Sequence, residues 1–268
     1  MLTNVQKEIM RMLIEKGEID NKDLQKELNL PLSTLYSQLE SLKGICVTRK
    51  RGKLELTSDL VTDQIGSFHE KLKVDRLKKE EIANFIVSKG YIKRGDITLL
   101  DCGTTNYLIA EKIIETQKRG LDIITMNPYV LREFLNYPEV GKVSIVGGML
   151  NWSDGSIYGP MAVETLGKLG EIGTVVLGID AIDKSGEIGI NDPLEIEQKK
   201  IMIEKAKKIF IPITIDKLDR AVSYSIGNLN NITKDLTIFI PGKFVEASES
   251  ALKVITSIGK KNFLFTGE

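Results

Sequence analysis

A glycine and two threonines directly follow a short apolar run, in the order ITLLDCGTTN at residues 97–106. An apolar pattern with helical spacing begins at once, over residues 107–114. This order is typical of a buried parallel strand that enters a helix through a tight loop. The loop N–H groups and the hydroxyls of Thr104 and Thr105 then lie at the positive end of the helix dipole, where phosphate binds well. A helix cap formed by either threonine is the plainer alternative.

Short apolar runs recur after this stretch and alternate with helical patterns to the end of the sequence. They lie at residues 121–125, 142–146, 174–178, 208–213, 236–240 and 262–265. The alternation predicts an α/β fold, in which helices cover both faces of a mostly parallel sheet. Such sheets bind ligands at the carboxyl ends of their strands.

Small, hydroxyl-bearing and charged residues follow the predicted strands, so we expect a ligand site at that edge of the sheet. The predicted ligand-binding residues are Asp101, Gly103, Thr104, Thr105, Thr125, Asn127, Gly147, Gly148, Asp180 and Lys217. Backbone amides and Lys217 suit a phosphate, and Asp180 and Asn127 suit hydroxyls, which indicates a phosphorylated sugar or polyol. Ordinary turn formation is the alternative for Thr125 and for the Gly147-Gly148 pair.

Three helical patterns occupy the first part of the chain, at residues 5–16, 23–28 and 33–42. Gly17 ends the first pattern, and Pro31 with Ser33 marks the start of the third. The tight turn between the second and third patterns predicts a helix-turn-helix.

Two strand-like runs follow, at residues 45–48 and 54–57, on either side of the sequence RKRGK at 49–53. Four cations and a glycine at a hairpin tip predict a wing that contacts DNA phosphates, while the third helix offers polar side chains to the major groove. The predicted DNA-binding residues are Ser33, Thr34, Tyr36, Ser37, Gln38, Arg49, Lys50, Arg51 and Lys53. A three-helix interaction module with a solvated basic loop is the alternative.

A single charged helix is predicted over residues 68–93, and its many lysines are typical of a solvated face. We therefore expect a winged helix-turn-helix at residues 1–60, a helical connector at 61–95 and an α/β domain at 96–268. The connector is expected to pack on the α/β domain through its apolar positions. Residues 147–159, which include Trp152, are predicted to form an exposed loop.

The composition limits the classes of function. Lys plus Arg and Asp plus Glu both number 37, which excludes a globally basic nucleic-acid protein but permits a local basic patch. Cys46 and Cys102 have no metal-ligand spacing, and we expect free thiols, without metal or cofactor. No signal-peptide pattern is present and no apolar run approaches the roughly 20 residues that span a bilayer, so we expect a cytoplasmic protein that does not bind a membrane.

Three sequence blocks together resemble the DeoR family of transcriptional regulators. They are DCGTT at residues 101–105, VGGML at 146–150 and EIEQKKIMI at 195–203, and the resemblance covers nearly the whole chain. Two segments depart from the family. The usual TIRRDL of the recognition helix is TLYSQL at 34–39, and the late DSSK motif is TIDK at 214–217, which keeps only Lys217.

The resemblance implies a DNA-binding transcriptional regulator, a repressor, of sugar or carbohydrate metabolism genes, with a sugar phosphate as effector. It also implies a sensor domain similar to ribose-5-phosphate isomerase, so an isomerase is the rival class. The loop GIDAID at residues 178–183 lacks the adjacent acidic pair of the isomerases, and no Lys-Gly-Gly sequence is present, so we expect binding without turnover. Two-fold DNA operators predict a homodimer or homotetramer.

Overall fold

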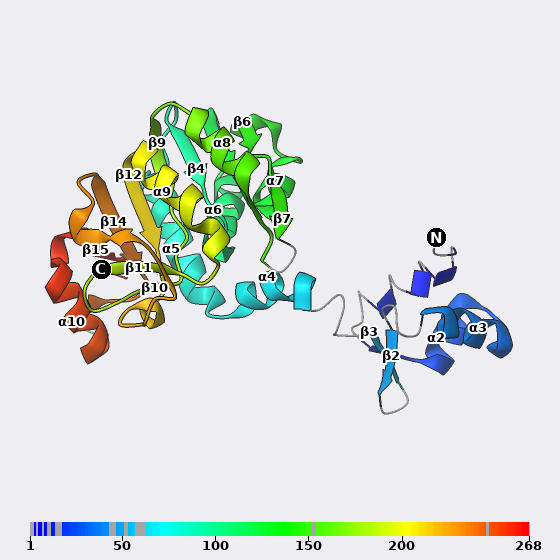
Figure 1. Ribbon diagram of the computed structural model, residues 1–268. Helices are drawn as coiled ribbons and strands as arrows, with labels where there is room; N and C mark the ends of the chain where they lie inside the picture. The colour runs from blue at the N-terminus through cyan, green and yellow to red at the C-terminus, as the bar shows by residue number, and fades with distance from the viewer. Residues whose placement is uncertain are drawn as a thin grey trace. The chain divides into compact units, whose positions relative to one another are not determined.

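The protein is described by a computed structural model over residues 3, 5–6, 8–9, 12–13, 18–42, 47–50, 53–56, 63–151, 154–244 and 247–267. The chain folds into two compact units, Met1–His69 and Glu70–Glu268 (Figure 1). The expected boundaries after residues 60 and 95 stay a prediction. Within these described ranges, no helix is long and apolar enough to cross a membrane.

The amino-terminal unit combines helices with a small antiparallel sheet in the order β1-β3-β2. Its helices pack through one apolar cluster, as the helical spacing predicts. The buried members of this cluster are Ile9, Met12, Leu13, Ile19, Leu24, Leu35, Leu39 and Leu54. The named elements are β1 (Glu18–Asp20), α2 (Asn21–Leu28), α3 (Leu32–Leu42), β2 (Val47–Lys50) and β3 (Lys53–Leu56).

Two details of this unit differ from the sequence prediction. β1 has no counterpart in the predicted pattern, and it pairs with β3 through Ile19 and Leu54. β2 extends to Lys50, so Arg49 and Lys50 lie in the strand rather than at the hairpin tip. The strand extends this far because both residues pair with β3: Arg49 lies opposite Leu54, and Lys50 lies opposite Lys53. Arg51 lies outside the described residues.

The predicted connector helix is two helices, α4 (Asp63–Lys73) and α5 (Arg76–Ser88). The break lies at Val74 and Asp75, where Asp75 adopts the left-handed conformation with φ 50°. Aspartate tolerates this region better than most residues, so the continuous helical pattern of the sequence conceals the break. Asp75 also pairs with Lys78 at 2.9 Å, which stabilises the start of α5.

The carboxy-terminal unit is built on a parallel sheet in the order β15-β14-β12-β9-β4-β5-β6. β4 is the first of these strands in the chain and lies inside the sheet, between β9 and β5. Strand order therefore reverses at β4 and β9, which is the place where open α/β sheets bind ligands. The strands are β4 (Ile97–Leu100), β5 (Leu121–Thr125), β6 (Gly141–Ile145), β9 (Ile172–Val176), β12 (Ala206–Pro212), β14 (Asp235–Ile240) and β15 (Phe263–Phe265).

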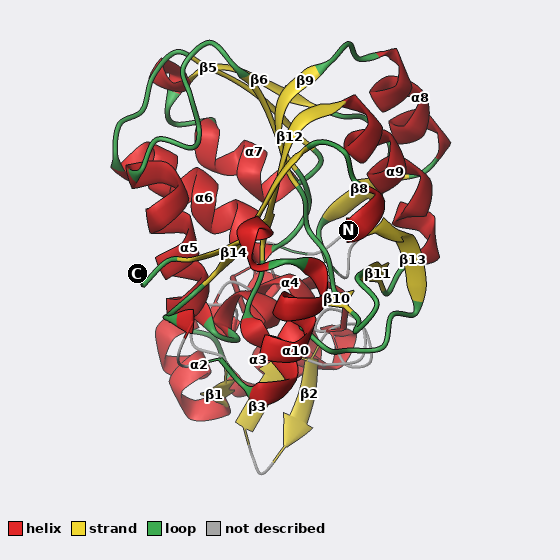
Figure 2. Cartoon of the chain, turned by 90° about the vertical axis from the view of Figure 1, so that its left-hand side faces the viewer, coloured by secondary structure: helices red, strands yellow, loops and turns green. Residues whose placement is uncertain are grey.

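Helices cover both faces of this sheet (Figure 2). On one face, α5 packs on α6 and α6 on α7; on the other face, α8 packs on α9. The predicted α/β fold with a parallel sheet and two covered faces is confirmed. The helices are α6 (Thr104–Glu115), α7 (Pro128–Phe134), α8 (Pro160–Lys168), α9 (Ile196–Lys205) and α10 (Glu249–Ile258).

The predicted loop at residues 147–159 contains an antiparallel hairpin, β7 (Met149–Asn151) with β8 (Ser156–Tyr158). Its inner part is not exposed, because Ser156 and Ile157 are buried and Ile157 N donates to Met126 O at 3.0 Å. Trp152 lies outside the described residues. A second antiparallel sheet contains β10 (Ala181–Ile182), β11 (Glu187–Ile190) and β13 (Tyr224–Asn228).

Candidate functional site

Asp101 joins the carboxyl ends of the two central strands. Its side chain is fully buried directly after β4. Oδ1 accepts a hydrogen bond from Cys102 N at 2.7 Å, and Oδ2 accepts one from Gly178 N, beyond β9, at 2.8 Å. The two backbones are so close that a Cβ on Gly178 would lie 2.5 Å from Cys102 O. Asp101 thus fixes the switch point of the sheet, and its oxygens are occupied by protein groups.

Lys199 supplies the charge that balances Asp101. Its Nζ, on α9, lies 2.7 Å from Asp101 Oδ2 and donates to Gly178 O at 2.9 Å. Glu195, one helical turn earlier, contributes a carboxylate oxygen at 3.2 Å. All three side chains are buried, so a low local dielectric strengthens their attraction.

The pKa values in this cluster follow from burial and charge. Burial acts to lower the pKa of Lys199, but Asp101 and Glu195 outweigh it and raise that pKa above its usual value. Burial raises the pKa of Glu195, and Lys199 opposes the shift. Lys199 therefore stays a cation, and the cluster is an ion-pair network that holds the ends of β4 and β9 together.

Sequence reasoning left Lys199 and Glu195 out of the site. A signal was present, because Glu195 and Lys199 are four residues apart and both belong to the block EIEQKKIMI. The partner Asp101 lies 98 residues away from Lys199, which only the fold can reveal.

The loop before α6 presents its backbone to the same edge of the sheet. Gly103 has φ 117°, a conformation that side chains rarely adopt, and it is the N-cap of α6 without a side-chain cap hydrogen bond. The capping alternative for Thr104 and Thr105 is therefore wrong. Thr104 is buried and Thr105 half-buried, within the first turn of the helix. The binding of an anion at this helix N-terminus stays a prediction.

The side chain of Asn106 stabilises this loop through hydrogen bonds to backbone carbonyls. Its buried Nδ2 donates to the carbonyl oxygens of Asp101 at 2.9 Å, Cys102 at 3.3 Å and Val176 at 3.1 Å. Its Oδ1 is buried and has no hydrogen-bond partner among the described residues. One side chain thus links the end of β4, the loop and the end of β9, and the sequence analysis did not select it.

Thr125 and Asn127 hold the neighbouring loop after β5. Thr125 Oγ1 donates to Leu100 O at 2.8 Å and accepts from Asn127 N at 3.1 Å. Asn127 caps α7, with Oδ1 accepting from Tyr129 N at 2.9 Å, and its Nδ2 donates to Gly103 O at 3.5 Å. Both side chains are fully buried. The turn alternative describes Thr125 well, and Asn127 connects the β5 loop to the α6 loop.

Asp180 and Lys217 lie on the other side of the switch point. Lys217 Nζ donates to Ile179 O at 2.6 Å, and Asp180 Oδ2 accepts from Asn191 N at 2.9 Å. Burial lowers the pKa of Lys217, and the charge of Asp180 opposes the shift. The loops after β4, β5 and β9, together with η4 (Ile215–Lys217), thus carry most of the predicted ligand residues.

Gly147 and Gly148 follow β6 at the edge of the sheet and are exposed. A Cβ on Gly148 would lie 2.6 Å from Tyr158 O, so this glycine permits the close approach of the β7–β8 hairpin. Turn and packing geometry account for the glycine at position 148. A role of Gly147 and Gly148 in binding a ligand stays a prediction.

Cys102 is not placed to act as a nucleophile. Burial, and then the charge of Asp101, raise the pKa of its thiol well above the usual value, so the thiol stays protonated. Its Sγ donates to Met126 O at 3.4 Å. In the part of the chain that the structure describes, no group of three or more His, Cys, Asp or Glu residues could hold a metal ion.

The predicted DNA-contacting positions of α3 lie largely on its solvent side. Ser33, Thr34, Tyr36 and Ser37 are exposed, whereas Leu35 between them is buried. The polar face is therefore separate from the face that packs in the core. Two hydroxyl or amide groups already have intramolecular partners. Tyr36 OH accepts from Asn21 Nδ2 at 3.4 Å, and Gln38 Oε1 accepts from Thr3 Oγ1 at 2.9 Å.

The basic hairpin is described in part. Lys53 is exposed on β3 and forms an ion pair with Glu18 of β1. Arg49 and Lys50 belong to β2, but the structure does not describe their side chains. Arg51 lies outside the described residues altogether. Their contact with DNA stays a prediction.

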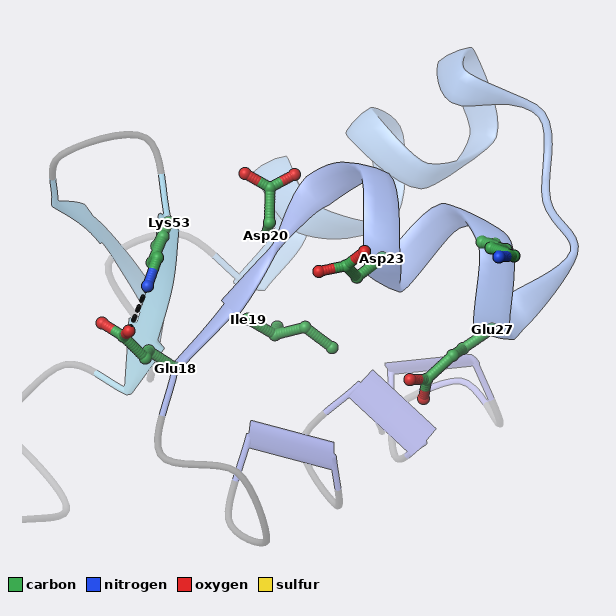
Figure 3. A pocket seen from close by; sticks show the side chains of 7 residues that line it. Glu18, Ile19, Asp20, Asp23, Glu27 and Lys53 are labelled. Atoms are coloured by element: carbon green, nitrogen blue, oxygen red, sulfur yellow. Dashed lines mark hydrogen bonds and ion pairs between the residues drawn. The ribbon is translucent and has the colours of Figure 1, made fainter.

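An acidic pocket lies in the amino-terminal unit between β1, β3 and α2 (Figure 3). Four of its seven lining residues carry carboxylates, which repel DNA phosphates. The pocket is therefore a poor surface for DNA, and it includes one predicted DNA-binding residue, Lys53, which pairs with Glu18. The lining residues are Glu18, Ile19, Asp20, Asp23, Lys26, Glu27 and Lys53.

Comparison with known families identifies one part of the chain. The model of the DeoR C terminal sensor domain matches residues 75–237, which is more than half of the chain. The chain belongs to the DeoR sensor-domain family. The match begins at Asp75, the residue of the left-handed break before α5. The matched residues thus include α5 and the sheet strands from β4 to β12, and the match ends within β14.

Similarity to curated proteins extends beyond the DeoR sensor domain. The chain is 22% identical to the glycerol-3-phosphate regulon repressor of Escherichia coli K12 over 225 residues, which is 84% of this chain and 86% of that protein. It is 21% identical to the L-fucose operon activator of the same organism, over 85% of this chain and 91% of that protein. These relatives are regulators of transcription by name.

Solved structures similar to this chain include ribose 5-phosphate isomerase A from Methanocaldococcus jannaschii, at 14% identity and a TM-score of 0.36. The match covers 52% of this chain and 53% of the isomerase, so the chain spans about half the length of that structure.

Proposed function

We propose that this protein is a DNA-binding transcriptional regulator of carbohydrate genes, controlled by a sugar phosphate that binds at the carboxyl edge of the central sheet. The observation that carries the proposal is the loop at Gly103, Thr104 and Thr105. It presents an uncapped helix N-terminus at the point where strand order reverses, in a chain of the DeoR family.

Two side chains of opposite charge, which follow β9 and β12, are assigned to the ligand as well. Lys217 provides a cation for a phosphate, and Asp180 provides an acceptor for a hydroxyl. Asp101 and Lys199 neutralise one another beneath the loop and act as supports. We infer that they set the loop geometry and do not contact the ligand.

DNA binding is assigned to α3 and the basic hairpin. The exposed polar residues of α3 suit the major groove, and the hairpin cations suit the backbone phosphates. Because effector and DNA bind different units, the effector acts only if it binds one arrangement of the two units better than another. We propose a homodimer or homotetramer, since such proteins read two-fold operators.

A gel-shift titration tests the proposal directly. The full chain is titrated on the DNA upstream of its own gene, with and without glycerol 3-phosphate or ribose 5-phosphate, and with glycerol and ribose as unphosphorylated controls. We expect a specific complex whose affinity responds to one or more phosphate esters and to neither control. Lys217→Met should lose the response to the phosphate ester. Lys200 is an exposed lysine on α9, so Lys200→Met is the control and should keep the response.

Catalysis is the competing function, and one assay addresses it. Isomerisation needs a base beside the reacting carbons, and Asp180 is followed by Ala181 and Ile182 rather than by a second acid. Incubation with ribose 5-phosphate should therefore yield no ketose above the uncatalysed background. Turnover that is lost in Asp180→Asn would replace the regulatory proposal with an enzymatic one.

A further inference from the structure

The side chain of Gln198, on α9, is completely buried, and its Oε1 has no hydrogen-bond partner among the described residues. Its Nε2 makes one long hydrogen bond, to Ile157 O of β8, at 3.4 Å (Figure 2). The reversed amide would place Oε1 against that carbonyl oxygen, so the contact determines which end of the amide is the donor. A buried acceptor without a partner destabilises a fold, and a donor that comes from a ligand recovers the lost hydrogen bond.

Hydrogen bonds connect Gln198 to the loop before α6. Ile157 N donates to Met126 O at 3.0 Å, and the thiol of Cys102 donates to the same carbonyl oxygen at 3.4 Å. Cys102 directly precedes Gly103, the N-cap of α6. The residue that Gln198 contacts and the α6 loop therefore share one partner, Met126 O, at the carboxyl end of β5.

The same part of α9 also reaches the ends of β4 and β9. Lys199, the next residue after Gln198, contacts Asp101 Oδ2 and Gly178 O, which follow those two strands. Glu195 lies three residues before Gln198 and therefore on the same side of the helix, and its side chain keeps 11% of its surface exposed. An amide oxygen without a partner and a carboxylate thus lie together next to the switch point of the sheet.

Asn106 provides a comparison at the same edge of the sheet. Its Oδ1 is also buried without a partner in the described chain, but its Nδ2 donates to three carbonyl oxygens at 2.9 to 3.3 Å. These hydrogen bonds commit Asn106 to the geometry of the loop. Gln198 makes a single long hydrogen bond, so its side chain can change partner at a smaller cost.

We propose that Gln198 Oε1 accepts a hydrogen bond from a hydroxyl of the effector and thereby selects a phosphorylated polyol over other phosphate esters. The inference rests on the proposed function and adds a specificity-determining residue to it. The carboxylate of Glu195 repels a phosphate, whereas acceptors suit hydroxyl donors, so the phosphate lies at the α6 loop and the hydroxylated carbons extend toward α9. Because Gln198 is completely buried, the β7–β8 hairpin must shift to admit the hydroxyl, and the hydrogen bond to Ile157 O is the one that such a shift breaks.

The test compares Gln198→Met with Lys200→Met in the full chain. Methionine is close to glutamine in length and lacks the amide, and Lys200 is an exposed residue on the same helix. Calorimetry measures the binding of glycerol 3-phosphate, ribose 5-phosphate and propyl phosphate, whose carbon chain has no hydroxyl. We expect the wild type and Lys200→Met to bind the better hydroxylated probe more tightly than propyl phosphate. Gln198→Met should lower this ratio of affinities at least about fivefold, and an unchanged ratio would overturn the inference.

Thermal unfolding separates ligand recognition from a structural role of Gln198. The melting temperature of Gln198→Met should stay within about 3 °C of the wild type, because the variant loses one long hydrogen bond and also removes a buried acceptor without a partner. A variant that melts much earlier and still keeps the ratio of affinities would show that the side chain acts only in the fold.

A measurement on the wild type does not depend on the folding of a variant. The side-chain amide of Gln198 is followed by NMR during titration with each probe. Its signal should shift on saturation with the better hydroxylated probe and stay in place with propyl phosphate. A signal that does not respond, or that responds equally to both compounds, would contradict a hydrogen bond between Gln198 and a hydroxyl.

The two proposals fail differently. If the wild type binds none of the three phosphate compounds, the effector assignment falls and this inference falls with it. If the wild type binds a probe and its DNA affinity responds, but Gln198→Met keeps the wild-type ratio of affinities, only the role of Gln198 is wrong.

Discussion

The ammonium of Lys199 lies 2.7 Å from Asp101 Oδ2, and both side chains are almost completely buried. Removing one member of such a pair leaves the other charge buried without compensation. We therefore expect Lys199→Met or Asp101→Asn to lower the free energy of unfolding of the carboxy-terminal unit by about 3 to 5 kcal/mol.

Urea unfolding followed by the fluorescence of the single tryptophan, Trp152, measures this loss. The exposed pair Lys168–Glu164 on α8, at 2.6 Å, is the matched control. Lys168→Met should change stability by less than about 1 kcal/mol. Similar effects at both pairs would contradict the view that burial makes the Asp101 pair structurally important.

Gly178 has no room for a side chain. A Cβ there would lie 2.5 Å from Cys102 O, and Gly178 N must stay 2.8 Å from Asp101 Oδ2. Gly178→Ala should destabilise the unit by about 1 to 3 kcal/mol, because the ends of β4 and β9 must separate. Gly167 in α8 has open space at its Cβ position, so Gly167→Ala should stabilise by about 0.5 to 1 kcal/mol. Thermal unfolding of both variants checks the opposite signs.

The hairpin cations should set the salt dependence of DNA binding. Simultaneous replacement of Arg49, Lys50 and Arg51 by alanine should lower affinity for all sequences alike. It should also reduce the slope of log K against log salt by about 2 to 3, since each lost phosphate contact removes roughly 0.9. Gel shifts at several salt concentrations measure the slope, and Lys168→Ala in the other unit should leave it unchanged. An unaltered slope would place the DNA surface elsewhere.

Several local patterns were sufficient to predict the main elements. The short apolar runs at residues 121–125 and 236–240 became β5 and β14 because continuous apolar runs of this length suit a sheet covered on both faces. The sequence ITLLDCGTTN became a strand, a tight loop and a helix for the reason the pattern suggests. The prediction of one continuous helix was wrong at Asp75. The spacing of apolar residues does not show where a single residue adopts the left-handed conformation.

By itself, the sequence determined the order of the strands of the parallel sheet and the polar residues at the strand ends. These properties depend on neighbours within a few positions, where apolar spacing and glycine act locally. Only the tertiary structure decided that Lys199 balances Asp101 and that Lys79 reaches Lys71 O. Burial and long-range electrostatics depend on which segments the sheet brings together, and a linear pattern of residue types does not contain that pairing.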